Sequence, residues 1–170
     1  VGSEMCIRDS CYCELGDFQK GLVIFNEIAS QDNPKYAEDV VKAKENIKLY
    51  TNNRIAKLQG ENDFDGIIAV ADEMLAVNPQ DALAQKIRLQ ALFDKKDYAG
   101  VIASAEEAAA GQTDEEERSD VYFILGAAYN ARTMPQQAID ALSKVTAGAN
   151  VAAAQKTVAQ LKENAAKANS

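Results

Sequence analysis

Two neighbouring stretches of the chain decide its fold class: Tyr122-Phe-Ile-Leu-Gly126-Ala-Ala-Tyr129 and Ala138-Ile-Asp-Ala-Leu142-Ser-Lys-Val145. In each stretch the large apolar residues recur every three or four positions, which places them on one stripe of a helix. Gly126 lies within the first stripe and has no side chain, so a partner helix can approach closely there. The two stretches therefore predict a helical hairpin. We expect Gly126→Leu to overpack this hairpin and Gly126→Ala to be nearly neutral.

A turn followed by a helix occurs four times along the chain, at Leu15–Phe25, Glu61–Ala71, Lys95–Ala105 and Arg132–Leu142. In the first three an aspartate precedes an aromatic residue, and in the fourth Pro135 takes the aromatic position. These positions are 46, 34 and 37 residues apart in chain order. Such repetition predicts a stack of similar helical hairpins.

The repeated pattern resembles the tetratricopeptide family, whose units are 34 residues long. Tyr122-x-x-Leu125-Gly126-x-x-Tyr129 carries the resemblance most fully, with Tyr122 where the family often has tryptophan. The second and third repeats are weaker, because Arg54-Ile55 and Arg88-Leu89 replace Leu125-Gly126. An unrelated bundle of helical hairpins with chance Asp-aromatic turns is the alternative.

The resemblance implies an all-α fold, namely a tetratricopeptide-like α-α hairpin solenoid. Its hairpins would form a right-handed superhelix of about nine helices that ends in a C-terminal capping helix. Residues 11–170 would form a single helical repeat domain. Its parts are repeats at about 11–35, 36–80, 81–112 and 114–148 and a capping helix at 150–168.

Local signals predict where several helices begin and end. One helix should run from about residue 36 to 59, because apolar residues keep a spacing of three or four with no proline or glycine before Gly60. Gly111 and Gly148 stand where a glycine typically follows a helix. Thr113-x-x-Glu116 fits a capping box. The acidic run after Thr113 then places negative charge at the positive end of a helix dipole.

Composition excludes several classes of function. The 170 residues carry 18 Lys and Arg against 26 Asp and Glu, a net charge of −8, and include no histidine. Nucleic acids and anionic membrane surfaces need a basic footprint, so neither is expected as a partner. Without histidine there is no imidazole base and no His-ligated metal site. No glycine-rich phosphate loop or long apolar span is present. We expect no catalysis, no cofactor and no membrane insertion.

The first ten residues, Val1–Ser10, resemble a translated sequencing adapter. The codons GTG GGC TCG GAG ATG TGT ATA AGA GAC AG spell the segment and match a transposase mosaic end with its flanking primer. We expect residues 1–10 to be non-native, with the natural N-terminus missing. Cys6 belongs to this segment. Cys11 and Cys13 are too close in spacing for a redox or zinc motif.

The resemblance also implies a ligand surface. In the family, the groove is lined mainly by the first helix of each repeat, on the side away from its own partner helix. This geometry selects six residues for a peptide-binding groove: Asn52, Lys86, Gln90, Phe93, Phe123 and Asn130. Phe93 and Phe123 lie outside the packing pattern and would anchor an apolar ligand. Alternatively, both phenylalanines fill the core between repeats.

Two functions from different classes remain. The first is a non-catalytic protein–protein interaction scaffold that binds a peptide or helix in its concave groove. The second is an accessory or regulatory region of a larger enzyme or cell-envelope factor whose N-terminal part is missing. A clamp for acidic C-termini is not expected, because Asp120 stands where such a clamp needs a basic residue. The sequence favours neither the cytoplasm nor the bacterial envelope as a location and sets no oligomeric state.

Overall fold

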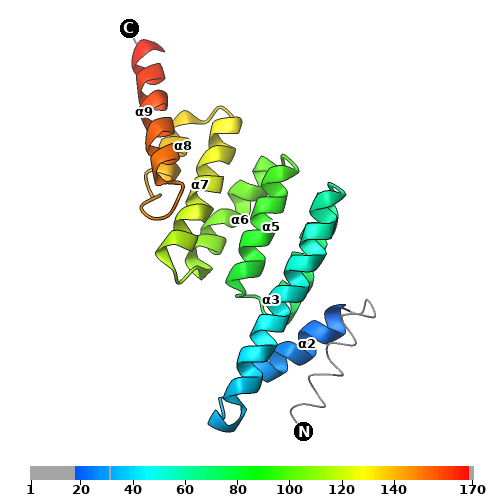
Figure 1. Cartoon of the computed structure of the whole chain (residues 1–170). Coiled ribbons are helices and arrows are strands. Elements are labelled where there is room, and N and C mark those ends of the chain that lie inside the picture. The colour runs from blue at the N-terminus through cyan, green and yellow to red at the C-terminus, as the bar shows by residue number, and fades with distance from the viewer. Residues whose placement is uncertain (1–17, 31, 169–170) are drawn as a thin grey trace. The chain divides into compact units, whose positions relative to one another are not determined.

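The computed structural model describes residues 18–30 and 32–168, which contain helices and turns but no strand (Figure 1). The helices are α2 (Phe18–Ala29), α3 (Ala37–Gly60), α4 (Phe64–Val77), α5 (Ala82–Asp94), α6 (Tyr98–Gly111), α7 (Glu115–Ala131), α8 (Pro135–Leu142) and α9 (Val151–Ala168). A short 3₁₀ helix, η1 (Pro34–Tyr36), precedes α3. The all-α prediction is confirmed for the described residues. The adapter-like segment and all three cysteines lie outside these residues.

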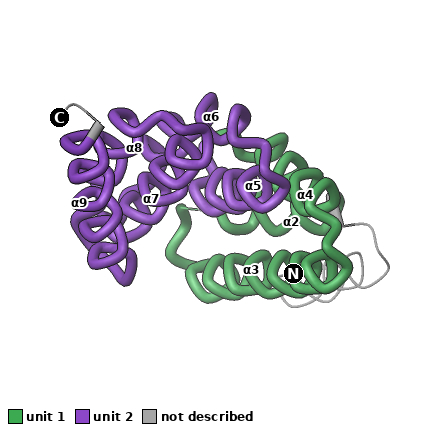
Figure 2. The backbone as a smooth tube through the Cα atoms, turned by 90° about the horizontal axis from the view of Figure 1, so that it is seen from above, with its two compact units in different colours: residues 1–79 green, residues 80–170 purple. Residues whose placement is uncertain are grey.

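The chain divides into two compact units, Val1–Pro79 and Gln80–Ser170 (Figure 2). Within the first unit, α2, α3 and α4 pack against one another. Within the second, each helix from α5 to α8 packs against the next, and α5 also packs against α7. The division coincides with the expected boundary between the second and third repeats. A single domain over residues 11–170 stays a prediction.

The two helix ranges predicted most fully are close to those observed. The helix expected at about 36–59 is α3 (Ala37–Gly60), and the capping helix expected at 150–168 is α9 (Val151–Ala168). Before α3, the Asn33 side chain accepts a hydrogen bond from the Lys35 N–H and caps η1. Both predictions succeed because apolar periodicity and proline act locally.

The same turn joins three pairs of helices, α3 to α4, α5 to α6 and α7 to α8. One residue of each turn has a positive φ: 55° at Asn62, 66° at Lys96 and 58° at Thr133. The next N–H in each turn donates to a carbonyl five residues earlier: Asp63 to Leu58, Asp97 to Leu92 and Met134 to Tyr129, at 2.9 to 3.0 Å. The N–H of the positive-φ residue itself donates to the carbonyl three residues earlier, at 2.9 to 3.0 Å. This pair of hydrogen bonds is a Schellman motif.

In each turn, the residue whose N–H donates to the carbonyl five residues earlier is also the N-cap residue of the following helix. The side chains of Asp63 and Asp97 accept hydrogen bonds from the N–H groups of Gly66 and Gly100, at 2.8 and 2.9 Å. Met134 makes no such side-chain bond, and Pro135 opens α8 instead. A proline suits this position because the first N–H of a helix has no helical partner. The repeated aspartate is therefore an N-cap at positions 63 and 97.

Replacing Lys96 by glycine should stabilise the fold. A side chain strains the left-handed conformation by about 1–2 kcal/mol, and glycine removes that strain. Its greater freedom in the unfolded chain offsets part of the gain, so we expect Lys96→Gly to raise the free energy of unfolding by about 0.5–1 kcal/mol. Urea denaturation would measure it. The matched control is Lys95→Gly, which should destabilise by a similar amount because Lys95 has φ −67°. Equal shifts in both variants would contradict this account.

The α7–α8 hairpin packs as its sequence predicts. Leu125 on α7 and Ala138 and Leu142 on α8 are buried. A Cβ atom built on Gly126 would lie 2.5 Å from Leu142 Cγ and 3.3 Å from the Leu142 backbone nitrogen. This contact argues against the expectation that Gly126→Ala is nearly neutral, because an added methyl group would overlap Leu142 unless the neighbouring atoms shift.

Three predicted helix signals are corrected. Gly111 is the last residue of α6 and is not in the left-handed conformation, so it is not a glycine that follows a helix. Gly148 does have a positive φ of 82°, but it lies in the connection between α8 and α9. The cap of α7 is Asp114 and not Thr113: its carboxylate accepts from the N–H groups of Glu116 and Glu117, at 2.9 and 3.1 Å. Acidic charge does occupy the first turn of α7, as expected.

The last helix covers the end of the α7–α8 hairpin over only part of its length. Ala154 is fully buried, and Val151 and Val158 pack against the cluster of Leu142, Val145 and Ala154. Ala165, in the second half of α9, is exposed. The first half of α9 therefore covers the hairpin, while Lys162 and the residues after it up to Lys167 are exposed.

Candidate functional site

Five of the six predicted groove residues lie on two packed helices of the second compact unit. Lys86, Gln90 and Phe93 are on α5, and Phe123 and Asn130 are on α7. The sixth, Asn52, is an exposed residue of α3 in the first unit. The five are called the α5–α7 face below.

Lys86 links the two helices of the α5–α7 face. Its Nζ lies 2.9 Å from Asp120 Oδ2 and also pairs with Glu117, both on α7. Partial burial lowers the pKa of Lys86, but hydrogen bonds and attraction from the two carboxylates outweigh it, so the pKa is raised above its ordinary 10.5. The stability that the raised pKa of Lys86 contributes is fully present below the pKa of an unfolded lysine, and it is lost as the pH rises through the higher folded value.

Asp120 extends this link to the connection before α9. Its other oxygen, Oδ1, accepts a hydrogen bond from Asn150 Nδ2 at 2.9 Å. The side chains of Lys86, Asp120 and Asn150 thus form a continuous polar row. Sequence reasoning treated Asp120 only as an obstacle to a basic clamp and missed this role. The signal was available, since Lys86 and Asp120 are 34 residues apart, which is one repeat period.

The structure corrects the expectation that both phenylalanines stand outside the packing pattern. Phe123 packs against the buried cluster of Leu142, Val145 and Ala154, so the core alternative applies to it. The Phe93 ring meets Tyr98, the first residue of α6, edge to face at 5.6 Å between centroids and an interplanar angle of 62°. Phe93 therefore contacts its own partner helix. Both side chains are half-buried, so each also presents part of its surface to solvent.

Gln90 and Asn130 are the exposed polar members of the α5–α7 face. Gln90 Nε2 donates to Asp94 Oδ1 at 2.9 Å. An exposed side-chain amide can both donate to and accept from a peptide backbone. The face thus combines amides, partly exposed rings and an ion pair, a set suited to binding through contacts and hydrogen bonds.

In the part of the chain that the structure describes, no group of three or more His, Cys, Asp and Glu residues could hold a metal ion. No helix of residues 18–30 and 32–168 is long and apolar enough to cross a bilayer. No family model and no curated protein matches this chain.

Proposed function

We propose that this chain is a non-catalytic interaction scaffold of the tetratricopeptide type, whose α5–α7 face binds a peptide or a helix of a protein partner. The observation that carries the proposal is the repeated turn at Asn62, Lys96 and Thr133. Similar φ values, the same pair of hydrogen bonds and spacings of 34 and 37 residues are typical of helical hairpins built as repeats. In such arrays the hairpins stack into a right-handed superhelix and present their first helices to a ligand.

In the proposed surface, ion pairs join the two helices, and the other side chains are exposed or partly exposed. The ion pairs of Lys86 with Glu117 and Asp120 join α5 to α7 at one end of the face. Gln90 and Asn130 are exposed and supply hydrogen-bonding groups, while Phe93 and Phe123 offer partly exposed rings. Because the ion pairs of Lys86 already exist in the free protein, a ligand would not have to order these side chains on binding. This lowers the entropic cost of association.

Selection from a library of random 12-residue peptides displayed on phage, followed by affinity measurements on the variants, tests the proposal. We expect Gln90→Ala and Asn130→Ala each to weaken a selected peptide about three- to tenfold, the loss of one or two hydrogen bonds. Gln136→Ala is the matched control. Gln136 is also exposed and also donates to an aspartate four residues later, Asp140 at 3.0 Å, but it lies on α8.

Two results would contradict this proposal or its interpretation. If no selected peptide depends on Gln90 or Asn130, the α5–α7 face is not the binding surface. If Gln136→Ala weakens binding as much as Gln90→Ala does, the effect comes from a general change in the protein. Denaturation midpoints of all three variants should match the parent, since each change removes an exposed side chain.

A further inference from the structure

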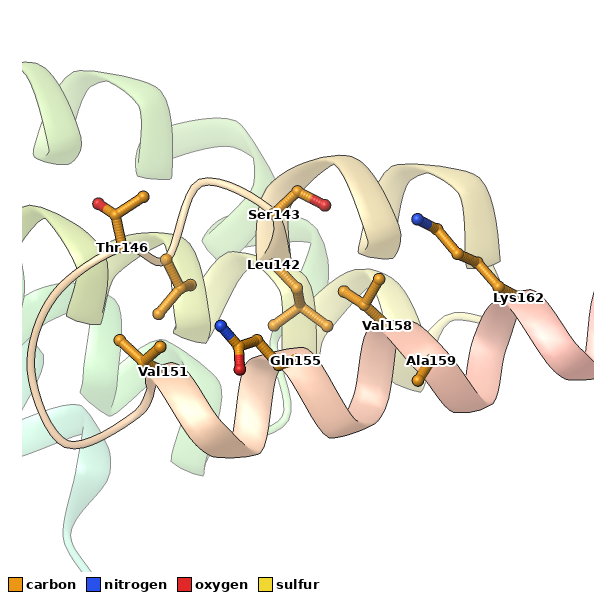
Figure 3. A pocket seen from close by; sticks show the side chains of 9 residues that line it. Leu142, Ser143, Thr146, Val151, Gln155, Val158, Ala159 and Lys162 are labelled. Atoms are coloured by element: carbon orange, nitrogen blue, oxygen red, sulfur yellow. The ribbon is translucent and has the colours of Figure 1, made fainter.

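A second surface, separate from the α5–α7 face, lies between α8 and α9 (Figure 3). It is a groove with a volume of about 530 Å³. Nine residues line it: Leu142, Ser143, Val145, Thr146, Val151, Gln155, Val158, Ala159 and Lys162. None of them belongs to the six predicted groove residues, so its function does not depend on the function proposed above.

The groove is bordered by a shortened second helix. α8 has 8 residues, whereas the corresponding helices α4 and α6 have 14 each. The chain that follows, residues 143–150, is not an α-helix and contributes Ser143, Val145 and Thr146 to the groove wall. The groove therefore exists because a non-helical segment stands where the other repeats continue as helix.

Hydrogen bonds to α7 hold this wall in place. The Ser119 hydroxyl is buried and accepts from the N–H groups of Thr146 and Ala147, at 3.2 and 3.1 Å. Thr146 Oγ1 in turn donates to Glu115 Oε1 at 3.0 Å. A wall fixed by the protein itself is preorganised, so an occupant meets a formed groove.

The floor of the groove is apolar and has the length of a short helix. Leu142 and Val145 are buried at its base, with Val151 and Val158 half-buried beside them. Along α9 the lining runs from Val151 to Lys162, which spans about 16 Å or three helical turns at 1.5 Å per residue. An amphipathic helix that places residues i, i+3, i+4 and i+7 on such a floor is a common mode of recognition.

Lys162 places a positive charge at the groove. In Figure 3 its side chain extends from α9 toward α8, at the Val158 end of the groove. No ion pair joins Lys162 to a carboxylate of the described residues. Lys86, at the contact of α5 with α7, is by contrast paired with two carboxylates. α9 carries three lysines against Glu163 alone, a net charge of +2 in a chain of −8.

We propose that the groove between α8 and α9 binds an acidic amphipathic helix of another protein. Its apolar face would lie on the half-buried Val151 and Val158, next to the buried Leu142 and Val145, and a carboxylate at its edge would pair with Lys162. Lys86 pairs with carboxylates of this chain. For Lys162, the carboxylate would come from the bound helix. Electrostatic attraction between the positive helix α9 and an acidic partner would also speed association.

The test uses a synthetic, end-blocked 14-residue helical peptide with leucines at i, i+3, i+4 and i+7 and glutamates beside them. Fluorescence anisotropy measures its binding to the full chain. We expect saturable binding that weakens as salt rises. Lys162→Glu should weaken binding about tenfold or more, because a favourable pair becomes a repulsive one. Lys156→Glu is the matched control, since Lys156 is exposed on α9 outside the groove lining and should change binding much less.

A second pair of variants fills the volume of the groove without changing its charge. Gln155 is exposed at the groove, and Gln160 is exposed on α9 outside the lining. Gln155→Trp should fill the groove and reduce binding about tenfold or more, while Gln160→Trp should leave it unchanged. Both sites are exposed, so both variants should keep the parental denaturation midpoint.

Three outcomes would overturn the proposal. The first is no saturable binding of the peptide at millimolar concentration. The second is an equal loss in Lys162→Glu and Lys156→Glu, which would indicate attraction to the helix as a whole. The third is self-association of the unliganded chain, measured by analytical ultracentrifugation, that disappears in Gln155→Trp. That result would make a second copy of the chain the occupant.

Discussion

Gly126→Ala is expected to lower the free energy of unfolding by about 1–3 kcal/mol, the usual cost of forcing extra volume into a packed contact. The added Cβ would stand 2.5 and 2.6 Å from Leu142 Cγ and Cδ2, far inside a normal carbon–carbon contact. Leu142 cannot move away easily because it is buried on α8, where it packs with Val145 and Ala154. Alanine favours a helix over glycine by about 1 kcal/mol, so the strain must exceed that gain. Urea denaturation followed by circular dichroism would measure the net effect.

Two further variants make this result interpretable. Gly60→Ala is the control, because Gly60 is the last residue of α3 and no atom lies within 4 Å of an added Cβ there. It should be neutral or stabilise by up to about 1 kcal/mol. Gly126→Leu should cost more than Gly126→Ala, since the larger side chain must displace Leu142 entirely. A Gly126→Ala protein with the parental denaturation midpoint would show that α7 and α8 do not pack as described.

The helix positions were predictable because their causes are local in sequence. The range of α3 follows from unbroken apolar spacing after Pro34 and from the absence of glycine before Gly60. The aspartates at positions 63 and 97 mark the starts of α4 and α6 through their own side-chain caps. Neither inference needs to know what the helix packs against.

The turns were harder to predict, because sequence reasoning looked for glycine at the left-handed positions. The structure places Asn62, Lys96 and Thr133 there. The two backbone hydrogen bonds of each turn and the packing of the joined helices hold a strained residue in that conformation. Similarly, Thr113 and Asp114 are both good cap residues, and only the geometry of α7 shows that the Asp114 carboxylate accepts two N–H groups.

The candidate site was predictable only in part. Helical spacing placed Lys86, Gln90 and Phe93 on α5 as a group. The pairing of Lys86 with Asp120 could have been inferred from their separation by one repeat period of 34 residues, but not from helical spacing alone. The packing of Phe123 toward α9 depends on how neighbouring helices pack, so the sequence could not show it. The groove between α8 and α9 had no sequence signal at all, since it arises where a helix ends early.

Phe25→Ala is expected to have the largest effect, a loss of about 3–5 kcal/mol in the free energy of unfolding of the first compact unit. Phe25 is 1% exposed and is one of the largest fully buried side chains among the described residues. It packs with Ile28 of α2 and Ala43 of α3, and its ring stacks on Tyr50 at 6.3 Å between centroids. Removing the ring leaves a cavity between α2 and α3 that the surrounding helices can close only partly.

Hydrogen exchange measured by mass spectrometry would locate the effect of Phe25→Ala as well as its size. Amides of α2 and α3 should exchange much faster, because Phe25 joins these two helices within the first unit. Val23→Ala is the matched control on the same helix, since Val23 is 38% exposed and its truncation should cost well under about 1 kcal/mol. Equal exchange in the two variants would mean that α2 does not pack on α3. A large effect of Phe25→Ala alone would show that α2 is a structural part of the first unit, as the buried contact of Phe25 with Ala43 requires.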